Sequence, residues 1–167
     1  MTSSHREQGR RAVFTGKMNE QVIQSQASLL QDVLLVRQYP EIKILGNLNK
    51  PGNVRIVGKA FPDFILLSSS LTLVFDAKHT DNKTKYTPLD RDIHQFANMV
   101  AVDQLNNPKY LAGYLLYWGE QEIGEFFRVT KYMAWRPTFE QGTGMAQGIG
   151  YNWMIDLYHN ILKELAP

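Results

Sequence analysis

Asp63, Asp76 and Lys78 are the residues of this sequence whose types and spacing best suit a chemical role. Asp63 follows a proline, and an Asp-x-Lys unit begins thirteen positions later (76 − 63). Two carboxylates and one ammonium group on adjacent rigid strands can hold a divalent cation and position a water molecule. These groups are the minimal set that metal-dependent hydrolysis of a phosphodiester bond requires. A surface hairpin with one ion pair would have the same spacing.

The segment that contains these three residues predicts a β-hairpin. Apolar runs at residues 65–67 and 71–75 flank a turn of three serines, and each run has the length of a strand. Because side chains alternate between the faces of a strand, we expect Asp76 and Lys78 on one face and Asp63 close to both. The second strand is apolar enough to be buried on both faces. A carboxylate and a lysine at its end are costly to desolvate unless they are paired, bind metal or reach a cleft.

Pro62-Asp63 and Asp76-Ala77-Lys78, at the end of a hydrophobic strand, resemble the core motifs of the PD-(D/E)XK nuclease superfamily. Within that superfamily the chain is most similar to the RecU-type Holliday junction resolvases, from about residue 11 to residue 118. Residues 15–20, a glycine followed by Glu20, look like the first-helix motif of that family. Residues 83–89, with the following His94-Gln95, are similar to its next loop and its glutamine-bearing helix.

The chain also departs from the family pattern. The acidic residue of the second motif is Asp76, where glutamate is commoner. The segment before Asp63 is shorter than the RecU stalk, and the tail after about Arg136 matches no part of the family.

The resemblance implies an α/β protein with a restriction-endonuclease-like core, in which helices flank a central mixed β-sheet. It implies an endonuclease that resolves four-way (Holliday) junctions by paired symmetric nicks, and a C2 homodimer, since such a junction is two-fold symmetric. The implied catalytic residues are Glu20, Asp63, Asp76, Lys78 and Gln95. The implied metal ligands are Glu20, Asp63, Asp76 and the carbonyl of Ala77. Hard oxygen ligands of this kind suit Mg²⁺, with Mn²⁺ as a substitute.

Positive charge is concentrated in two segments, although the whole chain carries only +2. Residues 1–17 have a net charge of +3, and residues 42–62 have +4 with no acidic residue. Cations beside a carboxylate site suit a phosphate backbone, but a solvated loop and a disordered arm have the same composition. The residues that we expect to contact DNA are Arg10, Arg11, Lys17, Lys50, Arg55, Lys59, Lys83 and Lys85.

Composition sets the remaining limits. The 167 residues predict a disordered basic arm at 1–12 and a single nuclease domain at 13–167, with a short basic projection around 45–59. The absence of cysteine excludes disulfides, thiolate zinc sites and cysteine nucleophiles. No apolar stretch approaches the roughly 20 residues that span a bilayer. We therefore expect no membrane association and a location in the cytoplasm of a bacterial or phage-infected cell.

The apolar pattern predicts the order of the elements. The predicted helices cover about Lys17–Arg37, Leu89–Leu105 and Tyr151–Leu165. The further predicted strands cover Ile42–Leu45, Val54–Val57, Leu111–Trp118 and Glu125–Thr130. In the first helix the apolar face would be Val22, Ile23, Ala27, Leu30 and Leu34, and in the second Ile93, Phe96, Ala97 and Val100. Residues 142–150 contain four glycines and predict a mobile segment.

Three other interpretations of the chain remain open. It could be a different PD-(D/E)XK nuclease that acts on duplex or flap DNA, with the same catalytic residues. It could also be a non-catalytic DNA-binding protein, or a structural domain in which the spacing is coincidental. For Glu20, a favourable interaction with the dipole of its helix is the alternative to a catalytic role.

Overall fold

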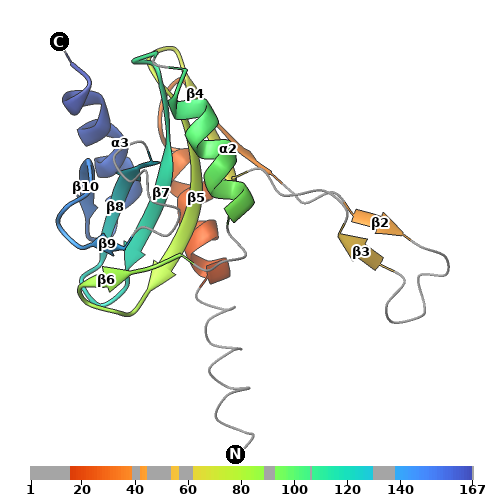
Figure 1. Cartoon of the computed structure of the whole chain (residues 1–167). Coiled ribbons are helices and arrows are strands. Elements are labelled where there is room, and N and C mark those ends of the chain that lie inside the picture. The colour runs from red at the N-terminus through yellow and green to blue at the C-terminus, as the bar shows by residue number, and fades with distance from the viewer. Residues whose placement is uncertain are drawn as a thin grey trace, which may run out of the picture.

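A six-stranded mixed sheet forms the centre of the protein (Figure 1). The computed structural model describes residues 16–38, 42–44, 54–56, 62–88, 93–105, 107–129 and 138–166. The strand order is β1-β4-β5-β7-β8-β10, in which β5 and β7 are parallel and all other neighbours are antiparallel. The strands are β1 (Val33–Arg37), β4 (Phe64–Ser68), β5 (Thr72–Thr80), β7 (Tyr110–Trp118), β8 (Ile123–Arg128) and β10 (Ala146–Ile149).

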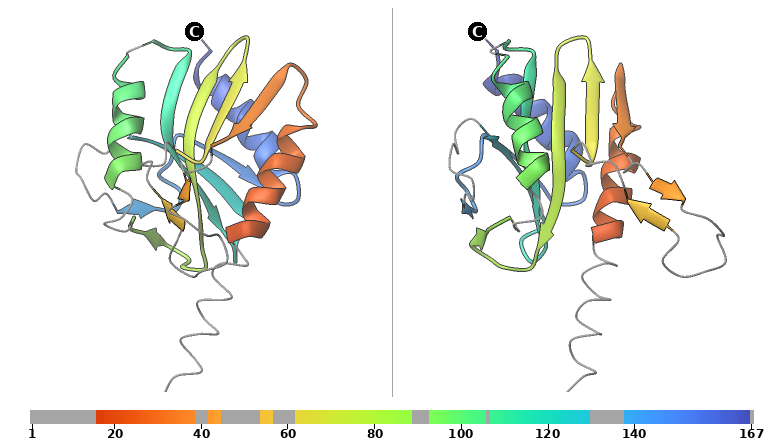
Figure 2. Two further views of the ribbon diagram at one scale, coloured as in Figure 1. Left: turned by 90° about the vertical axis from the view of Figure 1, so that its right-hand side faces the viewer. Right: turned by 45° about the vertical axis from the view of Figure 1, so that its right-hand side comes forward.

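Helices cover both faces of this sheet (Figure 2). α2 (Ile93–Asp103) packs on one face, where Phe96 and Met99 meet Val74 and Tyr114. The helix at residues 16–27 and α3 (Trp153–Glu164) lie on the opposite face. The sheet is therefore buried on both sides, as parallel strand pairs require. The predicted α/β class with a central mixed sheet is confirmed, and the architecture is compatible with a restriction-endonuclease-like core.

Two short strand pairs accompany the main sheet. β2 (Ile42–Ile44) pairs with β3 (Val54–Ile56), and β6 (Lys85–Tyr86) pairs with β9 (Phe139–Glu140), both antiparallel. β2 and β3 lie to one side of the main sheet (Figure 1). They confirm the two strands predicted there. The rest of the expected basic projection, and the expected arm at residues 1–12, lie outside the described residues.

The prediction of a first helix extending to Arg37 is wrong. The helix ends at residue 27, and β1 follows as an edge strand. Ile23 and Ala27 are buried as expected, but Leu34 is 60% exposed. Val33 and Leu35 pack against the core on either side of it, which is the two-residue period of a strand. Asp32 reverses the chain with a φ of 57°, a left-handed conformation that ends helical continuity.

In α2, Phe96 is buried and Val100 is partly buried against the core, as predicted. Ala97 is exposed, so its predicted core position is wrong, and Met99 is buried in its place. The side chain of Ile93 lies outside the described part.

The prediction of a mobile segment at residues 142–150 is also wrong, because this segment contains β10. Gly148 of β10 faces Gly124 of β8 across the strand pair. A Cβ at Gly124 would stand 2.0 Å from Trp153 Cε3, and one at Gly148 would stand 1.8 Å from the Trp153 carbonyl oxygen. The two glycines thus let α3 approach the sheet closely. The C-terminal tail, which no motif explained, completes the fold.

Replacing Gly148 by alanine should therefore destabilise the protein by about 1–3 kcal/mol, because the new methyl group meets rigid backbone. Thermal and urea unfolding followed by circular dichroism would measure the change. Gly16→Ala is the matched control, since nothing lies within 4 Å of that Cβ position. Equal stability of the two variants would contradict the packing of α3 described above.

Candidate active site

The hairpin of β4 and β5 brings Asp63 and Asp76 together just beyond the end of its own ladder. The two strands pair from Leu67↔Thr72 to Phe64↔Phe75, and the Phe64 and Phe75 rings stack 5.4 Å apart. The ladder ends there, one residue short of both aspartates. The Gln38 N–H donates to the Asp63 carbonyl over 2.8 Å, which fixes this point of the chain against the end of β1. The predicted hairpin is confirmed.

Asp76 and Lys78 form a close ion pair in the second half of β5, beyond the point where β4 stops pairing with it. Lys78 Nζ lies 2.7 Å from Asp76 Oδ2, and the Asp76 side chain is 0% exposed. By strand alternation both side chains lie on the face of Val74, which is the face that α2 covers. The predicted shared face is confirmed. Asp76 Oδ1 accepts no hydrogen bond from the described residues.

The environment of Asp76 disfavours its charged form. Burial raises the pKa of the Asp76 carboxyl well above its ordinary value, and the neighbouring Asp63 carboxyl adds to the rise. The Lys78 ammonium lowers the pKa but does not offset the burial. Asp63 and Asp76 are therefore close enough to repel one another in the absence of a cation.

The other buried carboxylates of the described residues have full sets of partners. Glu125 accepts from Trp118 Nε1 over 3.0 Å, and from the Gly142 and Gly144 N–H groups and Gln147 Nε2. Asp103 accepts two hydrogen bonds of 2.9 Å from Arg128 Nε. These two side chains hold loops and strands together. Asp76 differs from both because its partners are a lysine and a second acid, which is typical of a functional position.

Ala77 connects the two aspartates through its backbone. Its N–H donates to Asp63 Oδ2 over 3.3 Å. The N–H and C=O of one strand residue point to the same side, and β4 no longer pairs with β5 at this point. The Ala77 carbonyl is thus directed to the side of β5 on which Asp63 lies. Two carboxylates and one carbonyl oxygen converge at the end of the hairpin.

Glu20 reaches this group from the first helix. Burial raises the pKa of the Glu20 carboxyl, Arg37 lowers it, Asp63 raises it, and Lys17 and Lys78 lower it. These interactions bring Glu20 into the electrostatic neighbourhood of the aspartates. Glu20 Oε2 forms an ion pair with Arg37 Nη2 at the end of β1. The sequence interpretation missed Arg37, because it assigned that residue to the same helix.

Gln95 is the predicted site residue that no described contact joins to the acidic group. It lies in the first turn of α2 and is half-buried. Its helix covers the face on which Asp76 and Lys78 lie, so it belongs to the correct layer of the protein. The side chain of His94 lies outside the described part.

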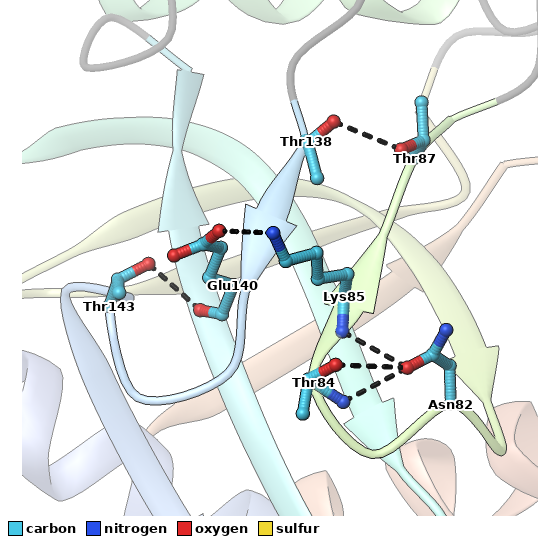
Figure 3. A network of polar contacts seen from close by, with 7 residues as sticks. All are labelled: Asn82, Thr84, Lys85, Thr87, Thr138, Glu140 and Thr143. Atoms are coloured by element: carbon cyan, nitrogen blue, oxygen red, sulfur yellow. Dashed lines mark hydrogen bonds and ion pairs between the residues drawn. The ribbon is translucent and has the colours of Figure 1, made fainter.

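The loop after β5 is organised by its own polar contacts (Figure 3). Asn82 Oδ1 accepts from the Thr84 and Lys85 N–H groups, and Thr87 and Thr138 share a hydrogen bond of 3.1 Å. Lys85 Nζ lies 2.9 Å from Glu140 Oε1 across the β6–β9 pair. Lys83 is similarly paired with Glu120 at 2.7 Å. Both predicted DNA contacts already have acidic partners.

Lys17 is exposed at the start of the first helix. Arg10, Arg11, Lys50 and Lys59 lie outside the described residues, and Arg55 lies on β3 with its side chain outside the described part.

The donor set fits a hard divalent cation. Asp63, Asp76 and the Ala77 carbonyl supply oxygen ligands, and the unpartnered Oδ1 of Asp76 is the orphaned acceptor that a cation would satisfy. Among the described residues, however, no three His, Asp or Glu side chains stand close enough to form a complete metal-binding group. Glu20 would join the site only by exchanging Arg37 for the cation.

Comparison with known proteins does not identify a family for this chain. No family model matches the chain, and no curated protein is significantly similar to it. None of the helices in the described ranges has both the length and the apolar character needed to cross a bilayer.

Asp76→Asn should stabilise the protein in the absence of divalent metal, because it removes a buried charge. The pKa of Asp76 is raised in the folded state above its ordinary value of 3.8. The folded protein therefore holds a proton that the unfolded chain has lost, and wild-type stability falls as the pH rises through this window. The advantage of the Asn variant should grow as the pH rises above the ordinary pKa of an aspartate, by up to about 1.4 kcal/mol per pH unit, and should level off once the folded-state pKa is passed.

Urea unfolding in EDTA at several pH values measures this effect. Asp32→Asn is the control, since Asp32 is exposed and Asn tolerates its positive φ. A stability difference for Asp76→Asn that stays flat with pH would show that Asp76 is not held near a second acid in a desolvated site.

Proposed function

We propose that this protein is a metal-dependent endonuclease that hydrolyses DNA phosphodiester bonds and resolves four-way junctions by paired symmetric nicks. The observation that carries the proposal is the fully buried Asp76 in the middle of β5, paired with Lys78 and adjacent to Asp63. A desolvated acid beside a second acid and a lysine lowers the stability of the fold, and such arrangements are typical of catalytic sites. The resemblance of the two motifs to the RecU-type resolvases supports the substrate.

The roles of the side chains follow from their chemistry. Asp63, Asp76 and the Ala77 carbonyl would hold Mg²⁺, which would act there as a Lewis acid on a non-bridging phosphate oxygen. Lys78, 2.7 Å from Asp76, would hold the attacking water and favour loss of its proton. The same ammonium group would stabilise the charge that develops on the phosphorane-like transition state. Water attacks in line, and the 3′-oxygen leaves.

The Glu20–Arg37 ion pair gives Glu20 a distinct part in this scheme. Glu20 is available to the site once its carboxylate turns from Arg37 towards Asp63. The guanidinium group released by this exchange would then be free to contact the phosphate backbone, for which its planar donors are well suited. Gln95, on α2, would help to position the water or the phosphate.

Paired nicks in a two-fold symmetric junction need two active sites related by a two-fold axis, so the proposal includes a homodimer. Basic residues before Asp63 and at the start of the chain supply charge for the DNA backbone.

Asp76→Asn should abolish cleavage and leave DNA binding unchanged or tighter, because only charge and metal are lost. Lys78→Ala should reduce the cleavage rate by at least about 10²-fold through loss of charge stabilisation. The measurement is cleavage of an end-labelled four-way junction beside linear duplex, flap and single strand of matching sequence, each with Mg²⁺, Mn²⁺ or EDTA. Lys109→Ala serves as the control, because Lys109 is an exposed lysine before β7 at the opposite end of β5.

The substrates separate the possible activities. Metal-dependent symmetric nicks in the junction alone would support a dimeric resolvase. Cleavage of duplex or flap instead would support metal-dependent phosphodiester hydrolysis but reject the four-way junction as the substrate. Normal cleavage by Asp76→Asn in Mg²⁺ would contradict the site, and DNA binding without any cleavage by wild type would indicate a non-catalytic DNA-binding protein.

A further inference from the structure

A pocket of about 410 Å³ lies beside the candidate active site. It is formed between the first helix, the end of β5 and the turn that precedes α3. Three aromatic rings stand in sequence at one side of the pocket, from β5, β7 and the start of α3: the His79 ring centre lies 5.8 Å from that of Tyr117, and the Tyr117 ring centre lies 5.1 Å from that of Trp153. A pocket of this size with aromatic walls and several polar side chains is typical of a site for a planar organic ligand.

Two large exposed side chains also line this pocket. Tyr151 is 92% exposed and Met18 is 50% exposed. The backbone of Tyr151 is fixed, since Gln26 Nε2 donates to its carbonyl and the Gly150 N–H donates to the Glu122 carbonyl over 2.8 Å. Because the backbone is held and a tyrosine side chain has only two rotatable torsions, stacking of a flat ligand on this exposed ring costs little conformational entropy.

The polar groups of the pocket indicate a neutral ligand with amino groups. Among the described residues the lining includes no lysine or arginine, and it includes the carboxylate of Glu122. The pKa of the Tyr117 hydroxyl is raised by burial and by Glu122, so the phenol remains protonated and can donate. Asn19 also lines the pocket, is 6% exposed, and its Oδ1 accepts no hydrogen bond from the described residues. Carboxylate and amide oxygens accept from the exocyclic amino groups of nucleobases, whereas a phosphate would be repelled.

The pocket and the acidic site share two elements. Asn19 precedes Glu20 on the first helix, and His79 follows Lys78 on β5. Because neighbouring strand residues point to opposite faces, the pocket lies across β5 from Lys78. The link between the two faces is Glu20, which adjoins Asn19 and interacts electrostatically with Asp63 and Lys78. A DNA strand with its phosphate at this acidic group would have an adjacent base close to the pocket on the first-helix side.

We propose that the pocket receives one unstacked nucleobase next to the cleaved phosphate, with the base stacked on Tyr151. The inference rests on the proposed nuclease function and adds to it a requirement for a base that is free to leave its stack, as at a junction, flap or single strand. Stacking of one base on an exposed aromatic ring corresponds to about tenfold in affinity or more.

A double-mutant cycle between the DNA and the protein tests the proposal. The parent is Asp76→Asn, so that DNA is bound without being cut, and its affinity is measured by fluorescence anisotropy. Abasic sites are placed one at a time within three nucleotides of the phosphate that wild type cleaves. The same series is measured with Tyr151→Ala, with Tyr151→Phe, and with Tyr110→Ala, an exposed tyrosine at the start of β7, as the control.

At one position the abasic site should weaken binding by about tenfold for the parent, for Tyr151→Phe and for Tyr110→Ala, and should have no effect for Tyr151→Ala. The same abasic penalty in Tyr151→Ala as in the parent at every position, with wild-type cleavage intact, would overturn the pocket and leave the nuclease standing. If Tyr151→Ala changes the oligomeric state measured by sedimentation, the surface around Tyr151 is an interface between copies of the chain. That result would also overturn the proposal of a nucleobase pocket. Absence of both DNA binding and cleavage would reject the nuclease and the pocket together.

Discussion

The desolvation of Asp76 is the constraint on which this account of the site depends. The parallel β5–β7 pair and the α2 side chains Phe96 and Met99, which pack on the face of Val74 and Asp76, keep water from Asp76 in the middle of β5. In that environment a carboxylate is stable only if it holds a proton, a counter-ion or a metal. Lys78 supplies part of the compensation, and Asp63 opposes it. The two carboxylates therefore lack full charge compensation within the fold, because one lysine cannot neutralise both. Such incomplete compensation is common in metal-dependent active sites.

The contrast with Asp103 and Glu125 gives this argument its specificity. All three carboxylates are buried. Asp103 is satisfied by the Arg128 Nε–H, shared between its two oxygens, and by the Ala112 N–H, and Glu125 is satisfied by four hydrogen-bond donors. Those two organise loops and strands. Asp76, the third, lacks such a set of partners, and replacing it by a neutral residue should stabilise the fold. A destabilising carboxylate at this position is therefore expected to serve a purpose other than stability.

Short-range pattern was sufficient to predict the hairpin and the placement of Asp63, Asp76 and Lys78. Strand alternation fixes Asp76 and Lys78 on one face, and a turn of three serines fixes which residues pair. The same reasoning failed at Leu30 and Leu34, whose spacing fits a helix although Leu34 lies on β1. The run Val33–Val36 also fits a strand with alternate residues inside, and only packing against β4 decides between the two.

Features that depend on long-range packing could not be read from the sequence. The Glu20–Arg37 pair joins residues that the predicted single helix would have placed several turns apart along its axis. The glycines of residues 142–150 suggested mobility, but Gly148 is required by the close approach of α3. The aromatic pocket brings together residues from the first helix, β5, β7 and the turn before α3. No local pattern contains such a group, because its members meet only in the folded chain.

Titration of wild type with Mn²⁺, followed by electron paramagnetic resonance of the free ion, tests the central claim most directly. The account predicts a bound Mn²⁺ that Mg²⁺ displaces, with affinity reduced at least tenfold in Asp63→Asn and in Asp76→Asn and unchanged in Asp32→Asn. Equal binding by wild type and Asp76→Asn, or no binding by wild type, would contradict the assignment of this carboxylate group as a metal site.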